Sequence, residues 1–263
     1  MKKAILLLWC VFASGAVFAA GGAAVKLDRV STDLGDRESL QRGARIFVNY
    51  CLSCHSAAYM RYNRVAADLG IPEDQMVKNL IFIPDAKGDL KPGSLMKATM
   101  PADVAKAAFN TVPPDLSVIT RSRTPDWFYT YMRSFYRDDK AVSGWNNTVF
   151  PSVSMPHVLH DWQGQQRAVY RTEKHESESV KDGKKVKHVT EEKVFDRFEI
   201  ERAGSMSPEQ FDAAMRDLTN FMVYLGEPAK LVRYQLGIMV LVFLAFLLVI
   251  AYLLKKEYWK DVH

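Results

Sequence analysis

The first regular pattern of apolar positions lies between residues 33 and 50. Its members recur at spacings of three and four residues: Leu40, Ala44, Phe47 and Cys51. That spacing predicts a helix with one apolar face. Gly43 lies near this face and would permit the close approach of another helix. The predicted helix leads directly into a pair of cysteines.

A second apolar stripe with helical spacing follows residue 207. Ser207 can cap the helix, Pro208 suits its first turn, and Gln210 completes a capping box. Gly226, with a proline two residues later, ends it. The stripe consists of Phe211, Met215, Leu218, Met222 and Leu225. A helix before the cysteines and a helix near the end of the domain predict a mainly α fold.

The segments between these two helices carry weaker patterns. Residues 71–125 are rich in proline and glycine, and short helices are predicted over 103–110 and 126–136. Residues 144–156 are expected to form an irregular loop. The charged segment 165–202 has alternating polar positions, which predict an exposed hairpin. We interpret it as a solvated insertion, and a ribbon that docks a partner is the alternative.

One segment is apolar on every face. Residues 236–254 contain no charged side chain, and at about 1.5 Å per residue they nearly span the roughly 30 Å hydrocarbon core of a bilayer. Lys255 and Lys256 follow, as expected on the cytoplasmic side. The pattern therefore predicts a transmembrane anchor over 231–254 and a cytoplasmic tail over 255–263.

The N-terminus has the pattern of a secretory signal. Lys2 and Lys3 precede an apolar run over 4–12, and small residues follow up to Ala19. This arrangement predicts a cleaved signal peptide over 1–20 and an exported domain over 21–230. An uncleaved anchor is the alternative, but the apolar run is short for a bilayer.

Composition narrows the function classes. The 263 residues are 48% hydrophobic, enough for a packed core, and the formal net charge is only +5. The chain has no dense basic patch interleaved with aromatic residues. Nucleic-acid binding is therefore not expected.

The cysteines carry the most specific signal in the sequence. Removal of the signal peptide would leave only Cys51 and Cys54, within the segment Cys51-Leu-Ser-Cys54-His55. C-x-x-C-H is the attachment pattern of a c-type haem. Two thiols add across the two haem vinyl groups, and the following histidine becomes the proximal ligand of the iron. One such motif predicts one covalently bound haem c.

Other roles for the cysteine pair fit less well. A disulfide across two residues would close too small a loop to stabilise the fold. A zinc site needs four ligands, and no second cysteine pair exists. A thioredoxin-like redox pair would lie in a βαβ context, which the pattern does not predict here.

The sixth ligand of the iron decides between an electron carrier and an enzyme with an open haem site. Met155 and Met100 are each followed by proline, which favours an extended strap that could lay sulfur on the iron. His157 and His160 are alternative nitrogen ligands. Spacing leaves all four open, since packing is the usual role of methionine.

Several blocks together resemble the cytochrome c1 family, the haem c subunits of cytochrome bc1 complexes, in its short bacterial form. The resemblance covers nearly the whole mature chain, and C-x-x-C-H is its least specific part. The blocks are CLSCHS (51–56), KPGSLMKA (91–98), PPDLSVITRSR (113–123), FPSVSMPHVL (150–159), GSMSPEQFDAAMRDLTNFMVYLGEPA (204–229) and KKEYWKD (255–261).

The resemblance implies a cytochrome c-type haem domain with long insertions and one C-terminal transmembrane helix. It implies that Met155 is the sixth ligand, which demotes Met100, and that an arginine binds a haem propionate. Arg123 matches that arginine best, and Arg121 is the alternative. Two departures are His157, where many relatives have a second proline, and the charged insertion.

The implied function is electron transfer within a quinol–cytochrome c reductase, without catalysis by this chain alone. The implied partners are cytochrome b, a Rieske iron–sulfur protein as electron donor, a cytochrome c as acceptor, and membrane lipid. The protein would be a single-pass protein of the inner membrane with its haem domain in the periplasm. The rival functions are an anchored cytochrome c that feeds a terminal oxidase, a peroxidase-like haem enzyme and a haem-based gas sensor.

Overall fold

The computed structural model describes residues 25–82, 84, 87–181 and 184–261, so the predicted signal peptide over 1–20 lies outside the described residues. The chain divides into two compact units. The larger unit contains residues 27–171 and the chain from residue 195 onward, and the smaller unit includes residues 172–194. The candidate site lies entirely in the larger unit.

The elements before the middle of the chain are short. In order they are α2 (Arg37–Ile46), the π-helical turn η1 (Phe47–Cys51), β1 (Ala57–Arg61), α3 (Tyr62–Leu69), α4 (Glu73–Leu80), β2 (Leu95–Met96), α5 (Ala102–Phe109) and α6 (Ile119–Ser122). The later elements are α7 (Pro125–Arg133), β3 (Phe135–Arg137), β4 (Trp145–Asn147), α8 (His160–Gln163), β5 (Gly164–Lys181), β6 (Lys184–Ala203), α9 (Pro208–Gly226) and α10 (Lys230–Tyr258).

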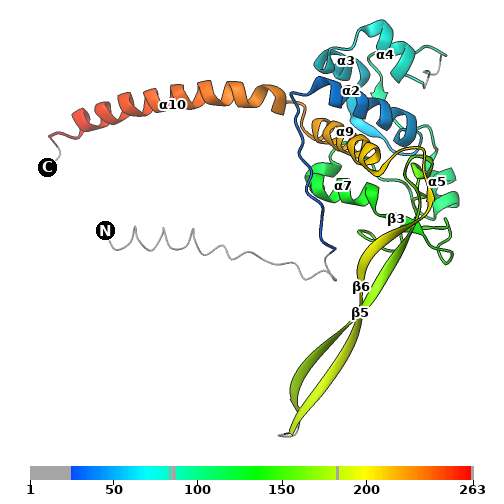
Figure 1. Ribbon diagram of the computed structural model, residues 1–263. Helices are drawn as coiled ribbons and strands as arrows, with labels where there is room; N and C mark the ends of the chain where they lie inside the picture. Colours follow the sequence, from blue (N-terminus) through cyan, green and yellow to red (C-terminus); the bar gives the residue numbers. More distant parts are fainter. Residues whose placement is uncertain (1–24, 83, 85–86, 182–183, 262–263) are drawn as a thin grey trace. The chain divides into compact units, whose positions relative to one another are not determined.

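The expected mainly α fold is confirmed. Among the described residues, each sheet has only two strands, and the pairs are β1–β2, β3–β4 and β5–β6. The core is instead built by helices, with α9 packed against both α2 and α7 (Figure 1). Its fully buried large side chains include Leu40, Phe47, Tyr62, Leu69, Met76, Met215, Phe221 and Tyr224.

The crossing of α2 and α9 depends on Gly43, as its position near the apolar face of the predicted helix suggested. A Cβ at Gly43 would lie 2.2 Å from the carbonyl oxygen of Asp217 and 2.7 Å from the Cβ of Phe221. Only a residue without a side chain permits this approach. Arg42 fixes the crossing on its solvent side through two bonds to Asp217, of 2.5 and 3.1 Å.

Local signals determine where the two main helices begin. Asp36 caps α2 by accepting from the amide of Ser39, so the helix begins later than residue 33, where it was predicted. The predicted capping box of α9 is confirmed, because Ser207 and Gln210 exchange side-chain to backbone bonds.

Tertiary pairing changes two predicted segments. The helix expected over 126–136 is α7, which ends at Arg133 because the next residues form β3. The loop expected over 144–156 contains β4, which pairs antiparallel with β3, with Phe135 opposite Asn147 and Arg137 opposite Trp145. Both predictions were wrong at these points, since strand pairing between distant residues has no local signal.

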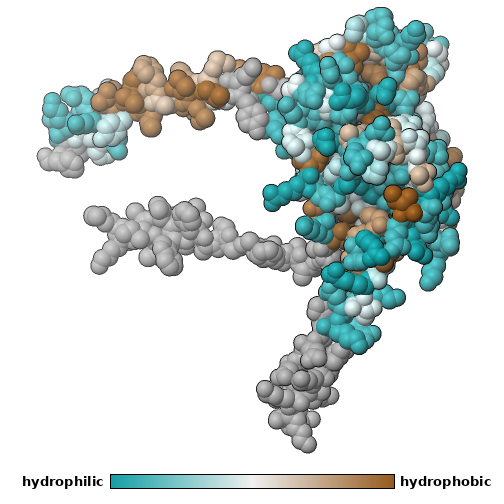
Figure 2. Space-filling view, in the orientation of Figure 1, coloured by the Kyte–Doolittle hydropathy of each residue, from teal (hydrophilic) through white to brown (hydrophobic). Residues whose placement is uncertain are grey.

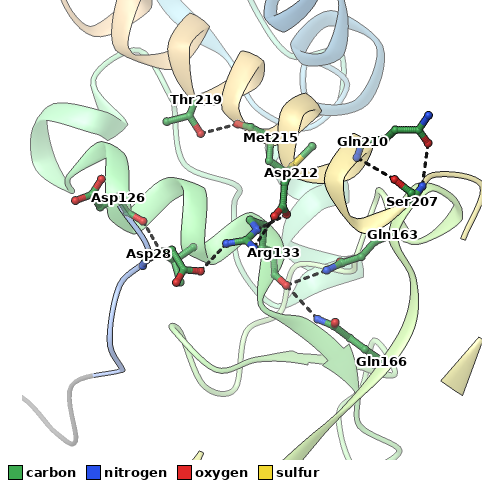
Figure 3. Close-up of polar contacts among 11 residues, drawn as sticks. Asp28, Asp126, Arg133, Gln163, Gln166, Ser207, Gln210, Asp212, Met215 and Thr219 are labelled. Carbon is green, nitrogen blue, oxygen red and sulfur yellow. Dashed lines mark hydrogen bonds and ion pairs between the residues drawn. The ribbon is translucent and has the colours of Figure 1, made fainter. Parts of the chain in front are cut away.

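Arg133, the last residue of α7, joins four parts of the head (Figure 3). Its guanidinium donates to Asp212 of α9 at 2.6 and 2.9 Å and to Asp28 of the N-terminal segment at 2.5 Å. Its carbonyl accepts from the side-chain amides of Gln163 and Gln166, at 2.9 and 3.0 Å. These bonds fix the C-terminal end of α7, which carries aromatic residues of the candidate site.

The charged insertion forms two long strands, β5 and β6, in agreement with the predicted hairpin. The apolar segment expected over 236–254 lies within α10. Its stretch Leu236–Tyr258 is long and apolar enough to cross a membrane, and none of its most apolar window is buried. Figure 2 shows the hydrophobic colouring of this helix on the visible face. The predicted anchor therefore exists as a helix of suitable length.

Candidate functional site

The C-x-x-C-H motif folds into one tight turn at the end of α2 and η1. Cys51 is the last residue of η1 and is buried, whereas Cys54 is half-buried, and both are free thiols. The carbonyl of Cys51 accepts from the amides of Cys54 and His55, at 3.1 and 2.8 Å. Burial raises the pKa of the Cys51 thiol to about 12. The turn thus brings two thiols and one imidazole together.

The imidazole of His55 is held by one backbone contact. Its Nδ1 lies 2.8 Å from the carbonyl oxygen of Pro114. Because a carbonyl can only accept, Nδ1 carries the proton in this bond, and Nε2 keeps a free lone pair. Burial lowers the pKa of His55, against the opposing effect of the Pro114 carbonyl, and this favours the neutral ring. A neutral ring oriented by its other nitrogen is the form that ligates a metal.

The loop that supplies Pro114 is tied to the motif by its next residues. The carboxylate of Asp115 accepts from the amides of Ala58 and Ser117, at 2.9 and 2.8 Å. The amide of Leu116 donates to the carbonyl of Ser56 at 2.7 Å. These bonds give a physical reason for the Pro-Pro-Asp-Leu-Ser block, since they hold the residues next to Pro114 against the chain that follows His55.

Met100 also lies beside the motif, but through its backbone. Its amide donates to the carbonyl of Ser53 at 3.1 Å, and the hydroxyl of Thr99 donates to the same carbonyl at 3.2 Å. The amide of Ala98 donates to the hydroxyl of Ser56 at 2.8 Å. This segment therefore forms a second support of the turn, in addition to the Pro114 loop.

Met155 is half-buried against a small aromatic cluster. It packs beside Phe135, Trp145 and Val153, and the hydroxyl of Tyr131 donates to its sulfur at 3.4 Å. This contact holds the thioether at a defined place in the strap. Sequence reasoning did not identify Tyr131, although its spacing of four from Trp127 on a predicted helix was a usable signal.

The two rival histidines have other surroundings. His157 is buried, with its ring stacked parallel to Phe135 at 5.0 Å, and burial lowers its pKa to about 4. His160 is exposed, with Nδ1 bound to the carbonyl of His157 and Nε2 3.2 Å from Asp161. His157 thus fills the aromatic cluster beneath the Met155 strap.

The two candidate arginines have different neighbours. Arg121 belongs to α6, and its guanidinium is 3.6 Å from the carboxylate of Glu227, the residue that follows α9. Arg123 lies over the ring of Trp127, at 5.2 Å from the ring centroid. Trp127 stacks on Tyr131 at 5.0 Å, and Tyr131 contacts Met155. The structure therefore connects Arg123, and not Arg121, to the strap residue.

The chain is similar to known proteins over most or all of its length. Residues 30–182 and 199–262 match the model of the Cytochrome C1 family. Over its whole length, the chain is 49% identical to the full "Cytochrome c1" of Allochromatium vinosum and 44% identical to the full "Ammonia monooxygenase gamma subunit" of Nitrosomonas europaea. It is also 25% identical, over 87% of its length, to 34% of the "Cytochrome b/c1" of Bradyrhizobium diazoefficiens.

Proposed function

Because this chain belongs to the cytochrome c1 family, and therefore carries one covalently bound haem c, we propose that Cys51 and Cys54 attach that haem and that His55 and Met155 are its axial ligands. The chain is the haem-carrying electron-transfer subunit of a cytochrome bc1 complex, with cytochrome b as a fellow subunit. The apolar helix α10 anchors it in a membrane.

The arrangement of His55 carries the assignment of the site. Its ring is kept neutral by burial and oriented through Nδ1 by Pro114, so Nε2 is available as a metal ligand. Cys51 and Cys54 belong to the same backbone turn as His55, which supports a common role for the three residues. The bound haem supplies a one-electron redox centre, and the protein residues hold it, orient it and set its surroundings.

Met155 supplies the second ligand in this proposal. A thioether is a weak electron donor that favours the reduced iron, so a His/Met pair gives a raised potential. Such a potential suits a subunit that accepts electrons from a Rieske iron–sulfur protein and passes them to a cytochrome c. Arg123 would bind a haem propionate through paired charge-assisted bonds. Arg121 is less suited, because it already faces Glu227.

The topology completes the proposal. The signal peptide over 1–20 exports the head, residues 21–230, to the periplasm, and the anchor over 231–254 leaves the tail, 255–263, in the cytoplasm. The lysines after the anchor favour this orientation. The charged hairpin over 165–202 is a solvated insertion of the head.

Two other functions would use the same haem. An anchored cytochrome c that feeds a terminal oxidase would have a similar head and a single anchor. The name of the Nitrosomonas relative suggests a place beside an ammonia monooxygenase. Purification of the native membrane complex distinguishes these functions, since co-purified cytochrome b and Rieske protein support ours, and an oxidase or a monooxygenase in their place would contradict it.

The ligand assignment is tested by replacing each of the two methionines. Met155→Leu should lower the reduction potential by a few multiples of about 59 mV, while the haem stays attached. For a one-electron couple, each such multiple is a tenfold change in the equilibrium constant. Met100→Leu is the matched control and should shift the potential by less than about one such multiple. The reverse result would make Met100 the ligand. A potential unchanged in both variants would point to His157 or His160.

A further inference from the structure

The hydroxyl of Tyr131 is the polar group that the structure places on the Met155 sulfur. It donates to Sδ at 3.4 Å, the ordinary length of a hydrogen bond to sulfur. The residue belongs to α7 and lies 24 positions from Met155 in sequence, so the contact is a product of the tertiary fold. A phenylalanine at this position would fill nearly the same space without the hydrogen bond.

The tyrosine ring is fixed on two sides. Trp127 stacks on it at 5.0 Å with an interplanar angle of 12°, and Phe135 meets it edge-on at 5.1 Å. The carbonyl of Tyr131 accepts from the side-chain amide of Asn147 at 2.8 Å. Arg133, two residues later, ties the end of α7 to α9. The hydroxyl is therefore preorganised, and its direction does not depend on a mobile side chain.

We propose that Tyr131 is a positioning residue that sets the orientation and the donor strength of the Met155 thioether, an inference that rests on the proposed role of Met155 as axial ligand. A thioether sulfur has two lone pairs. When one accepts the Tyr131 proton, only the other remains for a metal, so the hydroxyl selects the configuration at sulfur. The same bond draws electron density from the sulfur and places a positive dipole end beside it.

Both effects raise the reduction potential of the haem iron. A poorer donor and a nearby positive dipole each favour the less positively charged, reduced iron. Loss of the hydroxyl should therefore lower the reduction potential. It should also leave the sulfur free to present either lone pair, which alters the charge-transfer absorption of the sulfur-ligated oxidised haem.

The test compares Tyr131→Phe with Tyr129→Phe in the full-length protein purified in detergent. Tyr129 lies on the same helix and is also buried, so its variant is a matched loss of one hydroxyl away from the strap. Tyr131→Phe should shift the one-electron equilibrium constant two- to fivefold toward oxidation, or about 20–40 mV. The charge-transfer band should also move in Tyr131→Phe. In Tyr129→Phe, the reduction potential and the charge-transfer band should both stay at wild-type values.

A double-mutant cycle separates this inference from the ligand assignment. In a Met155→Leu background, Tyr131→Phe should lower the potential by much less than it does beside Met155, because the sulfur that directs the hydroxyl is gone. The role of Tyr131 would be overturned if Tyr131→Phe and Tyr129→Phe had equal reduction potentials and charge-transfer bands. A large drop in the potential of Met155→Leu would then still leave Met155 as the ligand. An unchanged potential in Met155→Leu would instead overturn the ligand assignment and the inference with it.

Discussion

Replacing Gly43 with alanine tests how the helix before the haem motif is held. Helix propensity alone predicts a gain of about 1 kcal/mol, since alanine favours helices over glycine. The structure predicts the opposite sign. The new Cβ would lie 2.2 Å from the backbone oxygen of Asp217, and real Cβ contacts are essentially never shorter than 3.0 Å. The helices α2 and α9 must therefore separate by most of an ångström.

The cost of that separation exceeds the gain from propensity. Forcing an extra methyl group into a packed interface costs about 1–3 kcal/mol. It cannot be relieved by a side-chain rotation here, because the obstacle is the backbone of α9. Because no side chain can move out of the way, the cost falls in the upper half of that range, about 2–3 kcal/mol. After subtraction of about 1 kcal/mol for propensity, Gly43→Ala should destabilise the head by about 1–2 kcal/mol. For a domain of this size, that lowers the melting temperature by roughly 2–8 °C.

The assay is thermal unfolding of the full-length protein in detergent, followed by the circular dichroism of the head. The surface variant Gly93→Ala is the control, because a Cβ there has no neighbour within 4 Å. Its melting temperature should match the wild type. A Gly43→Ala protein that melts at or above the wild-type temperature would refute the close crossing of α2 and α9.

Two further predictions concern attachment and anchoring. Cys51→Ala with Cys54→Ala should abolish covalent haem, because these are the two thiols of the motif turn, and a haem-stained band on a denaturing gel of the double variant would contradict this. Ending the chain at Lys230 should release a soluble, haem-bearing head, since the apolar stretch Leu236–Tyr258 is then removed. The measurement is haem in the supernatant of a strain that lacks the partner subunits, and a head retained on its washed membranes would argue against the anchor.

The parts of the fold that sequence predicted are those with local causes. The helical stripe through Leu40 and Phe47 and the capping box at Ser207 each depend on residues within a few positions of one another. Motif spacing likewise identified Cys51, Cys54 and His55 as a group, and the structure holds them in one turn. Local patterns of this kind predict the structure correctly, because the local preference and the tertiary fold agree at these positions.

The parts that sequence could not predict depend on long-range contacts. The strand β1 pairs with β2 across more than thirty residues, and β3 ends α7 by pairing with β4. The acceptor for His55 is a backbone carbonyl at Pro114, which no side-chain pattern reveals. The Pro-Pro-Asp-Leu-Ser block was recognised only by resemblance, and its physical reason is the set of bonds made by Asp115.

The choice between the two Met-Pro segments illustrates the limit most clearly. Proline has the same local effect after Met100 and after Met155, so spacing could not separate them. In the structure, Met100 is tied to the motif through its amide, a contact that any residue other than proline could make. Met155 is tied through its sulfur, which accepts a hydrogen bond from the Tyr131 hydroxyl. A fold that contacts the thioether itself depends on that atom, and this dependence is why we assign the ligand to Met155 and the structural support of the turn to Met100.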